Sequence, residues 1–256
     1  MRPVLIKFDG FGIPSYGMML VISFIIALFL VKREAKKYNI SPVIIENLAF
    51  WLMVGVIIGG RLLYVLFHGD EFRDIISIFE IWNGGMMFFG GFIGAFIAGT
   101  IYVKKQKLSI FLLSDITSPS IALGEFFTRI GCFLNGCCFG IPTGLPWGVH
   151  FPHGSFADRA GLDCPIHPTQ LYSSLFGLLL FFLLQKMLHR PHPQGSIFAY
   201  FLIFYGGFRF GIDFIRYYEN TGNFLINQLI SIIIVIAGII LLLKIKKTNR
   251  SRPEIL

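Results

Sequence analysis

Long apolar runs recur along this chain, and they limit the folds open to it more than any other feature. Seven runs of 20 to 22 residues are each long enough, at about 1.5 Å per helical residue, to cross a hydrocarbon core of roughly 30 Å. Because lipid offers the backbone no hydrogen-bond partner, and the runs are too long and continuous for barrel strands, they predict helices. The expected spans cover residues 11–31, 47–67, 84–103, 110–131, 169–188, 196–215 and 223–243. The sequence therefore predicts an all-α membrane protein with seven transmembrane helices.

The third run differs from the others in its glycine content. Small residues let two helices approach closely, and they also occur where a membrane segment is broken. The run is therefore expected either to pack closely against another helix or to be re-entrant. Its glycines are Gly84, Gly85, Gly90, Gly91, Gly94 and Gly99.

Composition agrees with a single polytopic transmembrane domain over residues 1–256. Hydrophobic residues make up 55% of the chain and charged residues 14%, whereas soluble chains carry about 25% charged residues. The first run is followed by the basic segment 32–37 rather than by a small-residue cleavage site, which indicates a retained span. The net charge of +8 is carried largely between the apolar runs, so it argues against nucleic acid as a partner.

The distribution of lysine and arginine predicts the orientation. Of the 22 basic residues, 14 fall after the first, third and fifth spans and in the C-terminal tail, and 5 fall on the opposite side. The positive-inside rule then places the N-terminus outside and the C-terminus in the cytoplasm. The long loop at 136–168, between the fourth and fifth spans, falls on the outer side. Its glycine, proline and histidine content suits a surface lid rather than a folded domain.

Three arginines lie within the predicted spans, at Arg61, Arg129 and Arg209. An arginine at membrane depth costs from about 3 to more than about 10 kcal/mol unless it faces a partner or a polar cavity. All three fall in the outer halves of their spans, which suggests a shared polar chamber. The alternative is that each side chain extends separately to the outer headgroups. Because the guanidinium fork suits phosphate, the chamber points to a phospholipid headgroup as its ligand.

Two of these arginines have a carboxylate one helical turn away. Glu125 precedes Arg129 by four residues, and Asp213 follows Arg209 by four. Residues at this spacing lie on the same face of a helix and can form ion pairs. Such pairs could orient the arginines toward a ligand, or they could simply lock the bundle.

Cysteines and histidines gather on or near the loop at 136–168. Cysteine and histidine are typical zinc ligands, but neither C-x-x-C nor H-x-x-x-H spacing is present, so no metal site is predicted. A disulfide from Cys164 to Cys137 or Cys138, ordinary packing of small apolar side chains, and a membrane thiol oxidoreductase all remain open. The residues concerned are Cys132, Cys137, Cys138, Cys164, His150, His153 and His167.

The segment 129–136, with the sequence RIGCFLNG, resembles the signature of the prolipoprotein diacylglyceryl transferases, whose core reads roughly G-R-x-G-N-F-x-N-G. Further landmarks occur in the order found in that family, and together they cover nearly the whole chain. They are 15–17 (SYG), 46–48 (ENL), 59–65 (GGRLLYV), 82–91 (WNGGMMFFGG), 167–172 (HPTQLY) and 205–209 (YGGFR).

The resemblance implies transfer of the diacylglyceryl group of phosphatidylglycerol to the lipobox cysteine of a prolipoprotein, with release of glycerol 1-phosphate. It further implies a location in the bacterial plasma membrane, a site facing the outer leaflet, and no cofactor. Arg129 and Arg209 match the catalytic arginines of the family. The implied substrate-binding residues are Arg129, Tyr16, Asn47, Arg61, Asn135, Gly140, His167 and Asp213.

The chain also departs from the family pattern. Phe89 stands where the family commonly has a histidine, Cys132 replaces an asparagine, Cys137 replaces a glutamate, and Asp213 stands where a glutamate is usual. Phenylalanine cannot act as a base, so that role would pass to His167, to Cys132 or to a water held by Asp213. These departures indicate a divergent, cysteine-containing branch, and they leave open a lipid-binding relative without transferase activity.

Overall fold

The structure is a computed structural model that describes residues 4–8, 11–69, 72, 74, 76–80 and 84–250. Trp82 and Asn83, part of one sequence landmark, lie outside the described residues. The chain forms two compact units, which are described separately below. Met1–Leu30 and Ser114–Leu256 make up the first unit, and Val31–Leu113 makes up the second.

The expected helical architecture is confirmed, and the described residues contain six helices long and apolar enough to cross a membrane. The predicted span at 169–188 matches its helix at both ends, while most of the others begin or end a few residues away. The six are α1 (Ser15–Lys37), α2 (Pro42–Phe67), α4 (Ile110–Asn135), α6 (Thr169–Leu188), α7 (Ser196–Ile212) with the 3-10 turn η4 (Asp213–Ile215), and α8 (Thr221–Arg250).

The run at 84–103 is not among these six. Its helix, α3 (Phe88–Lys105), has 18 residues and ends in Lys104 and Lys105. At about 1.5 Å per residue it is roughly 27 Å long, and its charged end shortens the apolar part further. The preceding Gly84 and Gly85 adopt positive φ angles of 85° and 77°, so the backbone leaves the helical conformation there.

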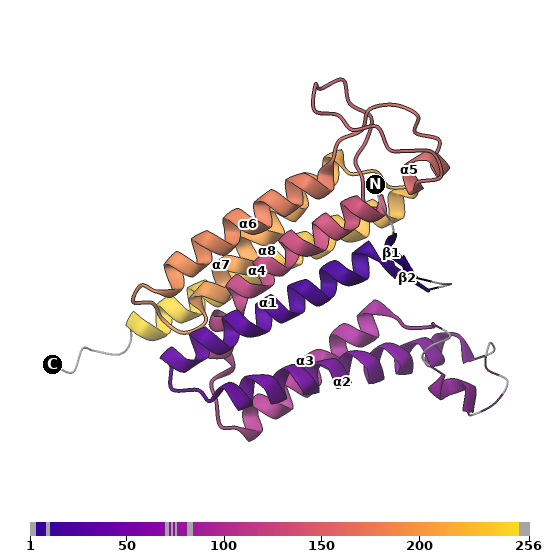
Figure 1. Cartoon of the computed structure of the whole chain (residues 1–256). Helices are drawn as coiled ribbons and strands as arrows, with labels where there is room; N and C mark the ends of the chain where they lie inside the picture. The colour runs from indigo at the N-terminus through magenta and orange to yellow at the C-terminus, as the bar shows by residue number, and fades with distance from the viewer. Residues whose placement is uncertain are drawn as a thin grey trace. The chain divides into compact units, whose positions relative to one another are not determined.

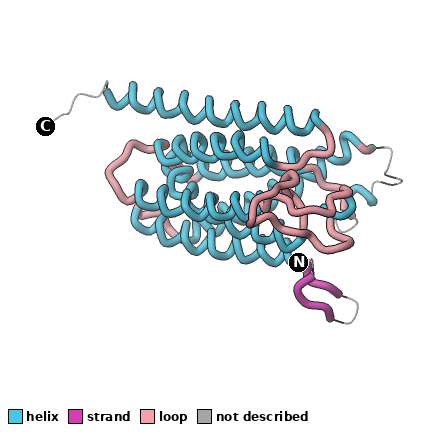
Figure 2. The backbone as a smooth tube through the Cα atoms, turned by 90° about the horizontal axis from the view of Figure 1, so that it is seen from above, coloured by secondary structure: helices cyan, strands magenta, loops and turns pink. Residues whose placement is uncertain are grey.

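The first predicted span also begins too early. Residues 11–14 are not helical but form β2 (Phe11–Pro14), which pairs antiparallel with β1 (Val4–Phe8) in a short hairpin (Figure 2). Proline disfavours helical geometry in the residue before it and donates no backbone hydrogen bond, so α1 begins directly after Pro14.

In the first unit α4 packs against α1 and α6, and α7 packs against α6 and α8 (Figure 1). A Cβ added to Gly131 would lie 3.0 Å from Met19 Cβ, and one added to Gly177 would lie 2.8 Å from the Ala122 carbonyl oxygen. These glycines set the close approach of α4 to its two neighbours. The buried apolar cluster between the helices comprises Ala122, Leu180, Leu184, Leu188, Ile197 and Phe201.

A buried carboxylate fastens the start of α7 to α4. Asp115, which is fully buried, accepts hydrogen bonds from the backbone N–H groups of Gly195 (2.6 Å) and Phe198 (2.8 Å). Its side chain also lies 3.7 Å from His192. The first N–H groups of a helix have no partner within the helix, so Asp115 supplies one from another helix.

The second unit consists largely of α2 packed against α3. A Cβ added to Gly55 would lie 2.5 Å from the Gly94 carbonyl oxygen, and Gly59 approaches the Gly90 backbone equally closely. The two helix backbones therefore touch along a stripe of glycines. The sequence predicted that the run at 84–103 either packs closely against another helix or is re-entrant, and the structure supports close helix packing.

The loop at 136–168 is more ordered than the predicted surface lid. Phe139, Ala157 and Ile166 are buried together, and the short helix α5 (Phe156–Arg159) supplies one of them. Isolated bridges pair Ile166 with both Pro142 and Val149. The loop therefore has a small apolar core of its own, although other large side chains such as Trp147 and Phe156 stay exposed.

Candidate active site

Arg129 lies in the last two turns of α4 and pairs with Glu125 one turn earlier. Arg129 Nε donates to Glu125 Oε1 at 2.7 Å, and the two side chains are 15% and 19% exposed. The predicted pair is therefore present. The bond engages Nε, and the two terminal nitrogens are the part of the guanidinium that can face an anion.

Arg209 lies at the end of α7 within a larger network. Arg209 Nη2 lies 3.1 Å from Asp213 Oδ1 and donates to Tyr218 Oη and Asn227 Oδ1, both at 3.0 Å. The Tyr218 hydroxyl donates to Asp213 Oδ1 at 2.6 Å. The second predicted pair is also present, and its network connects α7 with the following segment and with α8.

Tyr205 lies one turn before Arg209 on α7. The charges of Glu125, Arg129 and Arg209 all act on its hydroxyl. Arg129 and Arg209 belong to the same polar region of the first unit.

Arg61 on α2 has a different environment, within the second unit. Its guanidinium donates to the backbone carbonyls of Ile78 (2.7 Å), Gly84 (2.6 Å) and Gly85 (3.0 Å), and it lies 5.0 Å from the centre of the Phe72 ring. Arg61 Nη2 also donates to the backbone carbonyls of Ser77 (2.8 Å) and Glu80 (3.3 Å). The side chain thus holds the segment before α3, and its proposed role at a headgroup stays a prediction.

The remaining predicted residues fall into both units. Tyr16 is 37% exposed in the first turn of α1, beside the last turns of α4, where a Cβ on Gly131 would lie 3.3 Å from the Tyr16 Cα. Asn47 is exposed in the second turn of α2, and Phe89 is 57% exposed in the first turn of α3. Tyr16 is therefore placed near Arg129, whereas Asn47 lies in the second unit with Arg61.

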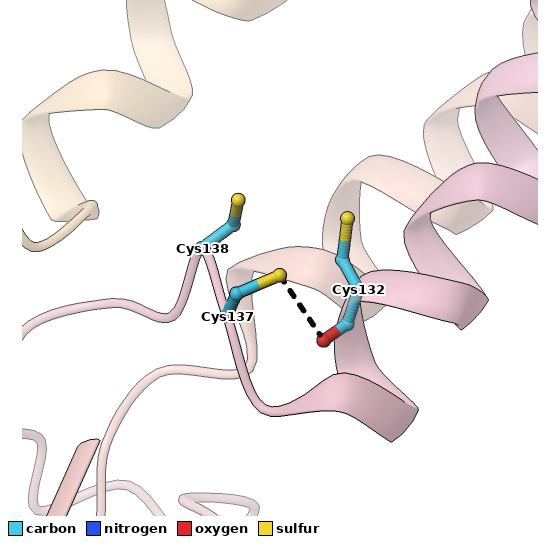
Figure 3. Close-up of side chains that lie close together, drawn as sticks. All are labelled: Cys132, Cys137 and Cys138. Atoms are coloured by element: carbon cyan, nitrogen blue, oxygen red, sulfur yellow. Dashed lines mark hydrogen bonds between the residues drawn. The ribbon is translucent and has the colours of Figure 1, made fainter. Parts of the chain in front are cut away.

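The end of α4 turns sharply and brings three cysteines together (Figure 3). The Sγ atoms of Cys132, Cys137 and Cys138 lie within 4.8 Å of one another, and Cys137 Sγ contacts the Cys132 carbonyl oxygen at 3.7 Å. Gly136 and Cys138 adopt φ angles of 79° and 63°, which reverse the chain. All four cysteines are free thiols, so neither disulfide considered for Cys164 is present in the structure.

Two polar residues at the start of α6 hold this turn, and the sequence analysis assigned them no role. Thr169 Oγ1 donates to the Cys138 carbonyl and Gln170 Nε2 to the Cys137 carbonyl, both at 2.8 Å. Both side chains are 1% exposed. Their position in the segment HPTQLY, at the start of a predicted span, could have indicated this role, because buried polar side chains need hydrogen-bond partners.

Gly140 and His167 meet where the loop closes on itself. Gly140 N–H donates to the His167 carbonyl at 2.9 Å, and a Cβ on Gly140 would lie 2.6 Å from both His167 Cβ and the Ile215 carbonyl oxygen. The His167 ring Nδ1 lies 3.2 Å from Tyr172 Oη. A glycine at position 140 therefore allows this segment to lie against the backbone of His167 and Ile215. The His167 ring lies beside the Tyr172 hydroxyl.

A cavity of about 390 Å³ opens beside the cysteine turn. Cys137, Cys138, Arg159, Arg216 and Glu219 contribute to its lining. Hydrogen bonds from the other two thiols lower the pKa of the Cys138 thiol, and the nearby charges of Arg216 and Arg129 act in the same direction. The cavity therefore combines fixed positive charge with nucleophilic sulfur.

The fold and this region define a class of protein: a helical membrane protein in which ion-paired arginines and a polar cavity gather at one end of a helix bundle. The family model for prolipoprotein diacylglyceryl transferase matches residues 3–244, and the chain belongs to this family. The resemblance seen in the sequence is thereby confirmed.

Curated relatives agree with the family model over almost the full length. A phosphatidylglycerol–prolipoprotein diacylglyceryl transferase of Clostridium tetani is 36% identical over 242 residues, covering 93% of this chain and 96% of that protein. The relatives of the same name from Methylococcus capsulatus and Bordetella avium are 35% and 34% identical. They cover 94% and 98% of this chain, and 94% and 97% of their own lengths.

Proposed function

We propose that this protein transfers the diacylglyceryl group of phosphatidylglycerol to the lipobox cysteine of prolipoproteins, the first step of lipoprotein maturation. Family membership over residues 3–244 supports the reaction class. The observation that carries the proposal is that Arg129 on α4 and Arg209 on α7 are each ion-paired to a carboxylate one turn away, because this arrangement provides fixed cations on two helices of one unit.

The reaction places its main electrostatic demand on the leaving group. The thiolate of the substrate cysteine attacks the glyceryl carbon that carries the phosphate ester, a carbon–sulfur bond forms, and the carbon–oxygen bond breaks. The electron pair leaves with glycerol 1-phosphate, and the thiol proton passes to a base. Negative charge on the phosphate oxygens increases along this path, so preorganised guanidinium groups lower the barrier.

Arg129 and Arg209 are proposed to bind and stabilise the phosphate, with Tyr16 and Asn135 as hydrogen-bonding neighbours. Glu125 and Asp213 hold the two guanidinium groups in orientation from one turn away. Gly140 and His167 complete the proposed substrate-binding set in the first unit. Binding roles for Asn47 and Arg61 stay predictions for the second unit, where Arg61 holds the segment before α3. Phe89 supplies no proton acceptor, so the base is sought among His167, Cys132 and a water at Asp213.

The site is proposed to face the outer leaflet of the bacterial plasma membrane. The lysine and arginine distribution supports an outside N-terminus and a cytoplasmic C-terminus, with α3 completing seven spans. In that orientation the loop at 136–168 and the arginine ends of α4 and α7 lie where secreted prolipoproteins emerge. Prolipoprotein signal peptides with a lipobox cysteine are the proposed protein partners.

Complementation tests the activity directly. In cells depleted of their own transferase, the wild-type chain is expected to restore lipidated lipoprotein, measured by the mobility shift and lipid labelling of a reporter. A membrane-inserted wild-type chain that produces no lipidated reporter would contradict the proposal and favour a lipid-binding relative. A defect in reporter disulfides instead of lipidation would favour a thiol oxidoreductase.

A further inference from the structure

Three thiols from one turn converge in the first unit, and the proposed transfer reaction uses them at most in part. Cys132 lies three residues before Asn135, the last residue of α4, and Cys137 and Cys138 follow the helix. Figure 3 shows the three side chains projecting into the space between the helix end and the following segment. Among the described residues they form one group of potential metal ligands.

The turn is built so that the sulfurs face one another. Cys138 adopts a φ of 63°, which non-glycine residues rarely adopt and which re-aims its side chain. Thr169 and Gln170 fix the carbonyls of Cys138 and Cys137 from the buried start of α6. Cys137 and Cys138 are therefore held through their carbonyls, and Cys132 is held by its position in α4.

We propose that Cys132, Cys137 and Cys138 bind one thiophilic metal ion, of the class of Zn²⁺, Cd²⁺ and Cu⁺, through their three sulfurs. At a metal–sulfur distance of about 2.3 Å, sulfurs around one ion lie about 3.8–4.0 Å apart. The three Sγ atoms lie within 4.8 Å of one another, so shifts below about 1 Å bring them to this spacing. Thiolate sulfur selects this class of ion over Mg²⁺ or Ca²⁺.

A charged side chain beside the site can balance the charge of the bound ion and its ligands. Binding replaces the three thiol protons, which leave to solvent, with one metal ion. Arg216 lines the same cavity as Cys137 and Cys138, so its positive charge can offset excess negative charge on the sulfurs. The Asn135 side chain lies within hydrogen-bonding reach of Cys137 and can orient its sulfur from outside the ligand set.

The site is accessible to an ion. Cys137 and Cys138 line the cavity of about 390 Å³, while Cys132 is 5% exposed and forms the inner side of the group. Such an arrangement gives the ion an entry path and leaves a further coordination position toward the cavity. A bound ion would also join the end of α4 to the segment after it.

Metal binding by the full-length chain in detergent tests the site, and the readout does not depend on transferase activity. After treatment with a phosphine reductant, the wild-type protein is titrated with Cd²⁺ while the thiolate-to-cadmium absorption band is followed. One tightly bound Cd²⁺ per chain is expected. Cys164→Ser is the matched control, since Cys164 packs in the loop core and should leave binding unchanged.

The ligand variants decide the outcome. Replacing Cys132, Cys137 and Cys138 together by Ser should abolish the absorption band, and Asn135→Ala should weaken affinity by roughly 10- to 100-fold. Circular dichroism and gel filtration check that each variant remains folded. Equal Cd²⁺ binding by the wild type and the triple variant would overturn the proposal. So would thiol counting in native membranes that finds two of the three cysteines joined as a disulfide.

Discussion

Arg61 and Arg129 are both arginines in long apolar helices, but the protein accommodates them in different ways. Arg61 donates to backbone carbonyls of a single neighbouring segment, and its fork is occupied by main chain. Arg129 has a carboxylate partner at Nε and a tyrosine hydroxyl nearby. The main-chain carbonyls around Arg61 occupy its guanidinium, so this arginine has a structural role. The carboxylate partner of Arg129 orients the guanidinium but leaves its terminal nitrogens able to bind an anion.

The same contrast separates Arg61 from Arg209. Arg209 donates hydrogen bonds to Tyr218 and Asn227, and its partner Asp213 is fully buried. Removing Arg209 therefore leaves the buried Asp213 carboxylate without a positive partner. Removing Arg61 instead breaks the hydrogen bonds that hold the segment before α3. The two kinds of site should respond differently to substitution, and the following variants are arranged by expected effect.

Arg129→Ala should give the largest loss of activity. Loss of one preorganised donor to developing negative charge typically slows a reaction by about 10²–10³-fold. Lipidation of a reporter by purified variant and phosphatidylglycerol measures the rate. Arg190→Ala, an exposed arginine after α6, is the matched control and should retain wild-type activity. Near-normal transfer by Arg129→Ala would mean that the phosphate is held elsewhere.

Arg209→Ala should impair both activity and stability. It leaves the buried Asp213 carboxylate without its cation, which costs about 3–5 kcal/mol for a buried pair. Thermal unfolding in detergent measures the stability. Adding Asp213→Ala should recover much of the lost stability but none of the activity. Recovery of transfer in the double variant would show that Arg209 acts only through the ion pair.

Arg61→Lys should lower stability more than activity. Lysine keeps the charge but cannot reproduce the fork, so several charged hydrogen bonds are lost at a cost of about 2–4 kcal/mol. Faster proteolysis within residues 76–85 and a lower melting temperature are the expected readouts, with transfer within about tenfold of wild type. A loss of transfer equal to that of Arg129→Ala, in a stable protein, would restore the headgroup role expected from the sequence.

Gly140→Ala should have the smallest effect of the four. The added Cβ would meet His167 Cβ and the Ile215 carbonyl oxygen at 2.6 Å, and relieving such an overlap costs about 1–3 kcal/mol. Gly144→Ala is the matched control in the same loop, because its Cβ would enter open space. Thermal unfolding should separate the two variants. Equal melting temperatures would contradict the tight loop closure at Gly140.

The features predicted well from sequence depend on short-range periodicity. The span at 169–188 and the two ion pairs at i, i+4 follow from the repeat of one helix, so no tertiary information was needed. Helix ends were less well predicted where a single residue type, such as proline or lysine, interrupts the apolar helical pattern. Pro14 sets the start of α1, and Lys104 and Lys105 shorten the apolar part of α3.

The features missed from sequence depend on chain reversal and long-range contact. Cysteine spacing argued against a metal-ligand group, yet the positive φ angles of Gly136 and Cys138 bring residues 132, 137 and 138 together. Gln170 reaches a carbonyl 33 residues away, which no local pattern specifies. The partners of Arg61 were likewise hidden, because they are main-chain groups of an irregular segment.

The cap on α7 has a consequence for how the protein is made. Asp115 lies 80 residues before the Gly195 N–H that it binds. During synthesis α4 therefore enters the bilayer with a carboxylate whose main partners have not yet left the ribosome. The packing of α4 in this region is therefore complete only after α7 has been made.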